Sequence, residues 1–156
     1  MEFRNRKCPR IPNYDYSKAN YYFVTICTDG KKCNFADPMH LNPFGKVAEQ
    51  CLCQIPVIFQ GISVDKYVVM PNHVHAIIII DDTSKKSASL TTVIGQYKSA
   101  VSRRIHEAAP GLKIWQRSFH DHIIRSEKQY EKIWNYIEGN PQCWNKDCFY
   151  IKEENH

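Results

Sequence analysis

The sequence predicts a single α+β domain in which helices cover an antiparallel sheet. Three observations lead to this prediction. The chain has 156 residues, of which 43% are hydrophobic, and this is enough for one substantial core. Four short segments are rich in β-branched and aromatic residues, as strands are. Three longer segments repeat apolar residues at helical spacing.

Four segments predict strands. Residues 20–28 (NYYFVTICT) are dense in aromatic and β-branched side chains. Residues 62–70 (ISVDKYVVM) and 73–80 (HVHAIIII) flank the turn pair Pro71-Asn72, and this arrangement predicts a hairpin. The stretch SFHDHIIR predicts the fourth strand.

Three segments predict helices. The first begins at Pro43, because Asn42 can cap a helix and proline fits the first helical position, and it is expected to end near Pro56. The second covers about residues 90–108, and its apolar stripe consists of Leu90, Val93, Ile94, Tyr97, Val101 and Ile105. The third covers roughly residues 127–140 and must stop at the proline that follows.

The order of these elements is β-α-β-β-α-β, followed by a helix. The first six match the split βαβ arrangement of ferredoxin-like and RNA-recognition-motif-like folds, an antiparallel sheet with two helices on one face. The other face is left for the third helix or for a ligand. Strand 73–80 is apolar on both sides, which predicts a central place in the sheet.

The formal net charge of +5 is compatible with a polyanionic partner such as nucleic acid, but it does not require one. Residues 1–19 predict a basic N-terminal arm, and residues 20–156 predict the domain itself. The basic side chains of the arm are Arg4, Arg6, Lys7 and Arg10. A solvated tail is the alternative interpretation of this arm.

Seven cysteines are an odd number, and none of them forms a CxxC pair. This pattern is atypical of a zinc site and of a disulfide scaffold. With no signal peptide, it predicts a protein of the reducing cytoplasm. The longest apolar run, around residues 76–80, is too short to cross a bilayer, so a membrane role is not expected.

Two histidines lie one residue apart at the start of a predicted strand. Residues two apart on a strand share a face, so His73 and His75 point the same way, with Ile77 and Ile79 continuing that face. Two parallel imidazoles can converge on one metal ion. Taken alone, the His73-Val74-His75 triplet could instead be an exposed strand end that binds no metal.

The third predicted helix carries a stripe of Ile133, Tyr136, Ile137 and Asn140. If it packs on the open sheet face, Ile133 and Ile137 can cover the strand isoleucines. Tyr136 and Asn140 then lie side by side, near the histidines if the helix has the right direction. The alternative is that Tyr136 is a half-buried tyrosine of the core and that Asn140 only ends the helix.

These residue types suit phosphodiester chemistry. A tyrosine hydroxyl, with an ordinary pKa of about 10, is a weak nucleophile at neutral pH. A divalent cation beside it can polarise a phosphodiester and stabilise the developing charge. The amide oxygen of Asn140 suits a hard cation and imidazoles suit softer ones, so the set is compatible with Mg²⁺ or Mn²⁺ and selects neither.

Five stretches, in this order, resemble the single-tyrosine HUH transposases (the transposase IS200-like domain), and most closely the REP-associated tyrosine transposases. They are YDYSKANYYFVTICT, YVVMPNHVHAIIII, IGQYKSAVSRRI, WQRSFHDHIIR and YIEGNP. They extend from Tyr14 to Pro141, so the resemblance covers nearly the whole domain.

The resemblance implies cleavage and rejoining of single-stranded, hairpin-bearing DNA. It implies that His73 and His75 bind a divalent metal, Mg²⁺ or Mn²⁺, at the scissile phosphate and that Asn140 completes the site. It also implies that Tyr136 is the nucleophile and forms a 5′-phosphotyrosine bond. Some relatives exchange the tyrosine helix in dimers and REP-associated ones can act as monomers, so the resemblance allows a monomer or a homodimer.

One departure from the family lies in SFHDHIIR, where relatives often have an aromatic pair and this chain has Phe119-His120. His120 and His122 are expected to contact DNA, with metal ligation as the less favoured alternative. Candidate DNA contacts outside the arm are Lys98, Arg103, Arg104, His120, His122 and Arg125. Trp115 and Phe119 could stack on unpaired bases or belong to the core.

Two other functions remain open from the sequence. A catalytically silent DNA- or RNA-binding module would have the same fold, although the presence of every polar site residue argues against it. A metal hydrolase acting on small phosphoesters is the weaker alternative.

Overall fold

A four-stranded antiparallel sheet forms the centre of the protein, in the order β4-β5-β1-β6. The computed structural model describes residues 20–37, 40–81 and 88–140. The strands of the sheet are β1 (Asn20–Cys27), β4 (Ile62–Met70), β5 (His73–Ile80) and β6 (His120–Ile124). The helices are α1 (Pro43–Cys53), α2 (Ile55–Ile58), α3 (Leu90–His106) and α4 (Glu127–Gly139).

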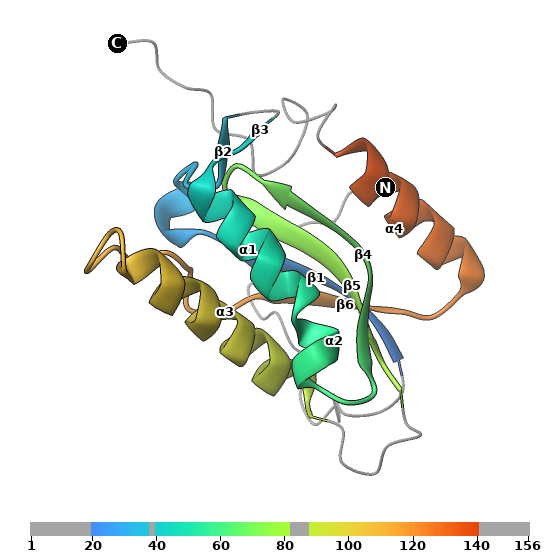
Figure 1. Ribbon diagram of the computed structural model, residues 1–156. Helices are drawn as coiled ribbons and strands as arrows, with labels where there is room; N and C mark the ends of the chain where they lie inside the picture. Colours follow the sequence, from blue (N-terminus) through green and yellow to red (C-terminus); the bar gives the residue numbers. More distant parts are fainter. Residues whose placement is uncertain (1–19, 38–39, 82–87, 141–156) are drawn as a thin grey trace.

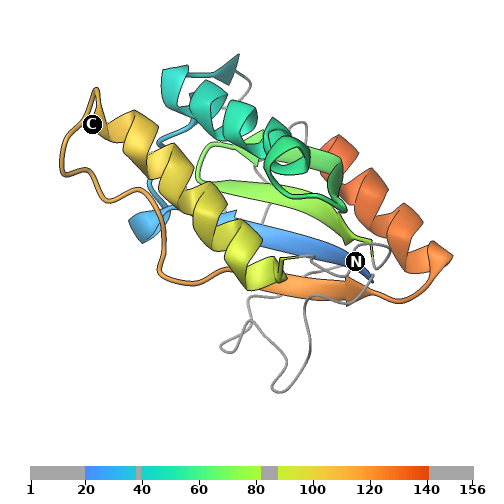
Figure 2. The ribbon, with the colours of Figure 1, turned by 60° about the horizontal axis from the view of Figure 1, so that its bottom comes forward.

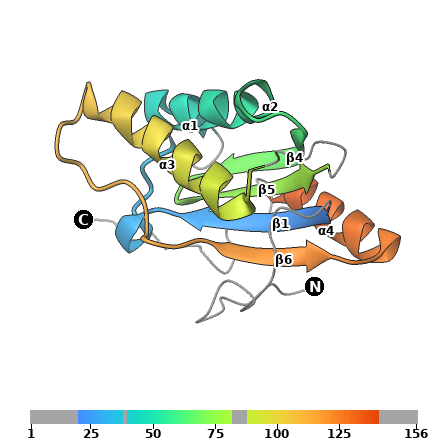
Figure 3. The same ribbon diagram turned by 90° about the horizontal axis from the view of Figure 1, so that it is seen from below.

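The helices divide between the two faces of the sheet. Helices α1, α2 and α3 lie together on one face (Figures 1 and 3). Helix α4 packs on the opposite face, where Ile133 and Ile137 meet Phe23, Ile77 and Ile124 in a separate apolar cluster (Figure 2). The predicted ferredoxin-like arrangement, with its third helix on the open face, is therefore confirmed, and β5 is central as expected.

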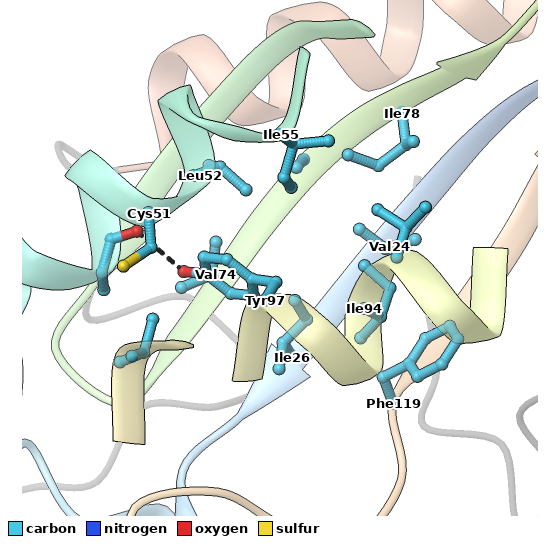
Figure 4. Packing of buried hydrophobic residues seen from close by; sticks show 14 of the residues in the cluster. Val24, Ile26, Cys51, Leu52, Ile55, Val74, Ile78, Ile94, Tyr97 and Phe119 are labelled. Atoms are coloured by element: carbon cyan, nitrogen blue, oxygen red, sulfur yellow. Dashed lines mark hydrogen bonds between the residues drawn. The ribbon is translucent and has the colours of Figure 1, made fainter. Parts of the chain in front are cut away.

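Strand alternation separates the two cores. On β5, Val74, Ala76, Ile78 and Ile80 face the large core beneath α1 and α3. Figure 4 shows part of this core, in which Ile94 and Tyr97 of α3 pack near β1 and β5. The hydroxyl of Tyr97 donates a hydrogen bond of 2.9 Å to the carbonyl of Ala48, which links α3 to α1. The buried phenol therefore has a partner.

The helix starts follow from local capping. Asn42 caps α1 by accepting a hydrogen bond from the Gly45 amide at 2.9 Å, and Ser89 caps α3 by accepting one from the Thr92 amide at 3.2 Å. The stripe predicted for the second helix is buried as expected. None of the helices in the described ranges is long and apolar enough to cross a membrane.

The prediction that the first helix ends near Pro56 was wrong in detail. Helix α1 ends at Cys53, and Pro56 lies in the first turn of the short helix α2. Proline lacks an amide hydrogen, so it breaks a helix from within but fits a first turn, where that hydrogen has no partner. The second predicted helix ends at His106, two residues earlier than expected.

The segment between β1 and α1 contains short elements that the sequence did not indicate. They are the 3-10 helix η1 (Asp29–Lys31) and the two-residue strands β2 (Ala36–Asp37) and β3 (His40–Leu41). The segment folds back over the turn between β4 and β5, where the Phe35 amide donates to the Pro71 carbonyl at 3.1 Å.

Polar contacts to the edge strand β4 add to the apolar docking of α4. Register slips between Val64 and Lys66, which makes Asp65 the extra residue of a β-bulge. The hydroxyl of Tyr130 on α4 donates to the Asp65 carboxylate. Lys66 forms an ion pair with Glu138 of α4 and also lies 4.1 Å from the ring centroid of Trp134. Helix α4 is thus held in one register on the sheet.

Replacing Gly45 with alanine is expected to destabilise the fold by about 1–3 kcal/mol, because a Cβ there would lie 2.0 Å from the Phe35 carbonyl oxygen. The same change at Gly95, on the open side of α3, meets nothing within 4 Å and is expected to stabilise by about 0.5–1 kcal/mol. Urea unfolding measures both values. Equal effects at the two positions would contradict the close packing of α1 on the Phe35 segment.

Candidate active site

The two histidines lie side by side at the start of β5, directly after the turn at Pro71-Asn72. His73 is opposite Cys27 of β1, and His75 is opposite Thr25. Both are almost completely buried, with exposed fractions of 0% and 1%, and their ring centroids are 4.4 Å apart. The shared face predicted from the sequence is confirmed, and the histidines lie inside the protein rather than at an exposed strand end.

A neighbouring side chain holds each imidazole through Nδ1. The Nδ1 atom of His73 is 2.7 Å from Oδ1 of Asn72, and Nδ1 of His75 is 2.9 Å from Oγ1 of Thr25. Phe23 stacks on His75 with ring centroids 5.2 Å apart. Since Nδ1 is engaged in both rings, Nε2 is the nitrogen that each can offer to a ligand.

Helix α4 brings Tyr136 to the histidines of the same chain. The Tyr136 ring packs edge-on against His75 with centroids 5.4 Å apart, and against Phe23 at 6.2 Å. The side chain is half-buried. The ring of this tyrosine therefore lies next to His75 and is partly exposed.

Asn140 ends α4 and lies beyond Tyr136. At the other end of the helix, Tyr130 packs against Tyr21, which is opposite Ile79 on β5, so the helix runs along β5 toward its histidine end. Four further residues advance the helix by about 6 Å, in the direction of His73. Asn140 is 3% exposed, and its Oδ1 has no hydrogen-bond partner among the residues that the structure describes. A buried amide oxygen without a partner costs about 1–3 kcal/mol, so a ligand at this position would stabilise it.

The second tyrosine of α4 has a different environment. The hydroxyl of Tyr130 donates to Asp65, and this hydrogen bond, followed by burial, raises the pKa of Tyr130 to about 12. A phenol with this pKa stays protonated at neutral pH. Its contacts with Tyr21 and Asp65 lie about 9 Å back along the helix from Tyr136.

His120 and His122 of β6 point to the same face of the sheet as the histidine pair. His120 is opposite Thr25, which in turn is opposite His75, so His75 and His120 are two strand spacings apart, about 10 Å. Burial lowers the pKa of His120 and favours its neutral form. Within the described ranges, no group of three His, Cys, Asp or Glu side chains is placed to hold a metal ion.

The predicted DNA-contacting cations of α3 lie on the layer opposite the histidines. Lys98 donates to the Gln116 carbonyl at 2.5 Å, and Arg104 donates to Gln50 at 2.7 Å, while Arg103 is exposed. DNA that crosses the histidines would have to pass around an edge of the sheet to reach them. Arg125 is exposed just after β6 and lies beside Tyr21 and Tyr130, on the sheet face of α4 but at the end away from the histidines.

The aromatic residues proposed for base stacking belong to the core. Trp115 is 6% exposed and Phe119 is 4% exposed, and both lie in the large apolar cluster. The indole of Trp115 donates to the Lys98 carbonyl at 3.2 Å. The stacking interpretation was therefore wrong, because burial under α3 takes these rings away from any strand of DNA. The basic residues of the arm (Arg4, Arg6, Lys7 and Arg10) lie outside the described residues.

The sequence reasoning did not identify the residues that support the histidines. Thr25 looked like an ordinary strand residue, and Asn72 looked like an ordinary turn residue. The alternation of side chains along β1 could have indicated that Thr25 shares a face with Phe23. The pairing of Thr25 with His75, however, is set by the tertiary structure. For Asn72 the signal was its position directly before a histidine in a turn.

Comparisons with known proteins show the family of the chain. The family model "Transposase IS200 like" matches residues 16–140. An uncharacterized protein of Haemophilus influenzae (strain ATCC 51907 / DSM 11121 / KW20 / Rd) is 32% identical over 169 residues, covering 94% of each chain. A protein of the same strain named "Putative REP-associated tyrosine transposase" is 24% identical over 140 residues, covering 84% of this chain and 76% of that protein.

Among solved structures, a REP-associated tyrosine transposase bound to a REP hairpin has the same fold. Its TM-score is 0.58 at 19% identity, covering 91% of this chain and 73% of that chain. The family match includes β1, the histidine strand and the whole of α4. The chain, in which one sheet face brings a histidine pair and a helix tyrosine together, therefore belongs to the Transposase IS200-like family.

Proposed function

We propose that this protein is a metal-dependent single-stranded DNA endonuclease and strand transferase that uses Tyr136 as its nucleophile. The observation that carries the proposal is the packing of the Tyr136 ring against His75, next to His73, within one chain. A site assembled within one chain is compatible with a monomer or with a homodimer.

The residues present fit a divalent cation. His73 and His75 would bind it through Nε2, since Nδ1 of each ring is engaged with Asn72 or Thr25. Asn140 would add an amide oxygen, which has no partner within residues 20–37, 40–81 and 88–140. A mixed nitrogen and oxygen set with room for phosphate and water oxygens suits Mg²⁺ or Mn²⁺. A bound cation supplies Lewis-acid polarisation of the scissile phosphodiester.

The chain's own residues account for the rest of the reaction. The oxygen of Tyr136 attacks phosphorus as the phenol loses its proton, and a bond forms between that oxygen and the phosphorus. The bond from phosphorus to the 3′ oxygen breaks, and this oxygen takes up a proton to become a free 3′-hydroxyl. Rejoining is the reverse attack by a 3′-hydroxyl. Phe23 packs against both rings and supports the contact between Tyr136 and His75.

We propose hairpin-bearing single-stranded DNA as the substrate. The supporting observation is the solved relative in complex with a REP hairpin. His120, His122 and Arg125 lie on the sheet face of α4 and are the proposed contacts within the described residues. Lys98, Arg103 and Arg104 would contribute only to DNA that wraps around the sheet edge.

The test uses the full chain with REP-type hairpins that carry randomised single-stranded flanks. With Mn²⁺ or Mg²⁺, a 3′-end label is expected to migrate with the protein in SDS, while a 5′-end label is released on a fragment with a free 3′-hydroxyl. EDTA is expected to abolish the adduct, and added Mn²⁺ to restore it. Binding without any adduct would instead favour a silent DNA- or RNA-binding module. Metal-dependent hydrolysis of a small phosphoester that survives loss of the Tyr136 hydroxyl would favour a hydrolase.

A further inference from the structure

We propose that Asn72 is a positioning residue that holds His73 in the tautomer required for metal binding, with the proton on Nδ1 and the lone pair on Nε2. The inference rests on the proposed metal site at His73 and His75. It assigns a role to a buried residue of the turn that touches neither the substrate nor the metal.

The argument begins with the contacts of the Asn72 side chain. Asn72 is fully buried, with its Nδ2 3.3 Å from the Lys31 carbonyl oxygen and its Oδ1 2.7 Å from Nδ1 of His73. The Lys31 carbonyl can only accept a hydrogen bond, so it must face the amide NH₂ group. The amide oxygen, which also can only accept, must then face His73, and Nδ1 of His73 must carry the proton.

The backbone keeps Asn72 in this position. Its own carbonyl accepts hydrogen bonds from the amide of Thr28 at 2.9 Å and from the hydroxyl of Thr28 at 3.0 Å. The Pro71 carbonyl accepts from the Phe35 amide at 3.1 Å. These contacts dock the turn, and with it the backbone of Asn72, on the segment that follows β1. The side-chain amide of Asn72 is held by its hydrogen bonds to the Lys31 carbonyl and to His73.

The Lys31 carbonyl, which orients Asn72, belongs to a backbone segment with an unusual conformation. Gly30 has φ 62° and Lys31 has φ 55°, both in the left-handed region. Lys31 is the only residue other than glycine with a positive φ in the described part of the chain. A left-handed conformation costs an L-residue about 1–2 kcal/mol, and such cost is concentrated at functional sites. Here it aims the Lys31 carbonyl at the amide next to the histidine pair.

The contact of the second histidine, His75, does not fix its tautomer in the same way. Nδ1 of His75 contacts the hydroxyl of Thr25 at 2.9 Å, and a hydroxyl can both donate and accept. Thr25 can therefore accept from Nδ1 when a metal occupies Nε2, but it does not enforce that state. Asn72 is consequently the residue that prepares one of the two imidazoles for a metal before the metal arrives.

The tautomer can be observed directly in metal-free protein. Nitrogen-15 NMR of the full chain, labelled at histidine, is expected to show His73 with its proton on Nδ1 and an unprotonated Nε2. A His73 with its proton on Nε2 in the wild-type protein would overturn the proposal. This measurement depends on neither catalysis nor metal.

Two substitutions separate the acceptor role of Asn72 from its structural role. Asn72→Asp and Asn72→Leu both lose the contact with the Lys31 carbonyl, but only aspartate can still accept from His73. We expect Asn72→Leu to weaken Mn²⁺ binding about 10–100-fold and to lose the single tautomer, while Asn72→Asp keeps the tautomer and most of the affinity. Thr28→Val, which loosens the turn but leaves the amide, is expected to lower the melting temperature without changing the tautomer.

Equal losses of Mn²⁺ affinity in Asn72→Asp and Asn72→Leu would show that Asn72 is only structural, and the proposal would fail. A wild-type protein that shows the expected tautomer but binds no Mn²⁺ would contradict the proposed metal site instead. The role of Asn72 in orienting His73 would then stand without the metal. The two failures are therefore distinguishable.

Discussion

Tyr136→Phe is expected to lower the yield of covalent protein–DNA adduct by at least about 10³-fold, with hairpin affinity unchanged within a few-fold. The substitution removes only the nucleophilic oxygen. The phenylalanine ring can keep the packing against His75 and Phe23, so the fold and the docking of α4 should remain. The adduct is measured by SDS gel with labelled hairpin, and the affinity by gel shift in EDTA.

The matched control for this prediction is Tyr130→Phe. Tyr130 lies on the same helix, but its hydroxyl donates to Asp65 and its ring packs on Tyr21, away from the histidines. We expect Tyr130→Phe to lower the melting temperature slightly while the adduct still forms. An undiminished adduct in Tyr136→Phe, or its loss only in Tyr130→Phe, would refute the assignment of the nucleophile.

His75→Ala is expected to weaken Mn²⁺ binding by at least about 100-fold and to reduce cleavage in parallel, while DNA affinity changes only a few-fold. The substitution removes one of two imidazoles whose centroids are 4.4 Å apart, together with the ring that contacts Tyr136. Calorimetry with Mn²⁺ measures the metal affinity of the full chain, and the adduct assay measures cleavage.

The control is His120→Ala, which removes a histidine from the same row of the sheet, about 10 Å from His75. It is expected to leave Mn²⁺ binding unchanged and to weaken DNA binding modestly. If His75→Ala lowers metal affinity, DNA affinity and thermal stability to the same extent, then His75 is a structural residue. Loss of metal binding in His120→Ala would add β6 to the metal site.

Much of the fold was predictable because the local signals agreed with the tertiary structure. The hairpin of residues 62–80 is observed with the predicted strand limits, since β-branched runs on both sides of Pro71-Asn72 leave little alternative. The stripe of α3 is buried as expected because its 3.6-residue period matches one core-facing side. Pro56 misled the prediction because a proline that ends one helix can also begin the next.

The candidate site was only partly predictable. The sequence placed His73 and His75 on one face and put Tyr136 with Asn140 on one stripe, because strand and helix periods are local properties. It could not say that α4 runs toward the histidine end of β5, which depends on the contacts of Tyr130 and Glu138 of α4 with Asp65 and Lys66 of β4. The sequence allowed Trp115 and Phe119 to be either exposed or buried. Only the packing beneath α3 shows that they belong to the core.

By itself, the sequence determined the order of the elements, the shared face of the histidine pair and the helix stripe that carries Tyr136. Each of these follows from the spacing of neighbouring residues along the backbone. Only the tertiary structure decided that Thr25 and Asn72 hold the two imidazoles, that the amide of Asn140 is buried, and that α3 points its cations away from the site. The contact of Thr25 with His75 and that of Asn72 with Lys31 join segments 50 and 41 residues apart, and their register is set by sheet pairing and side-chain packing, which no local pattern encodes.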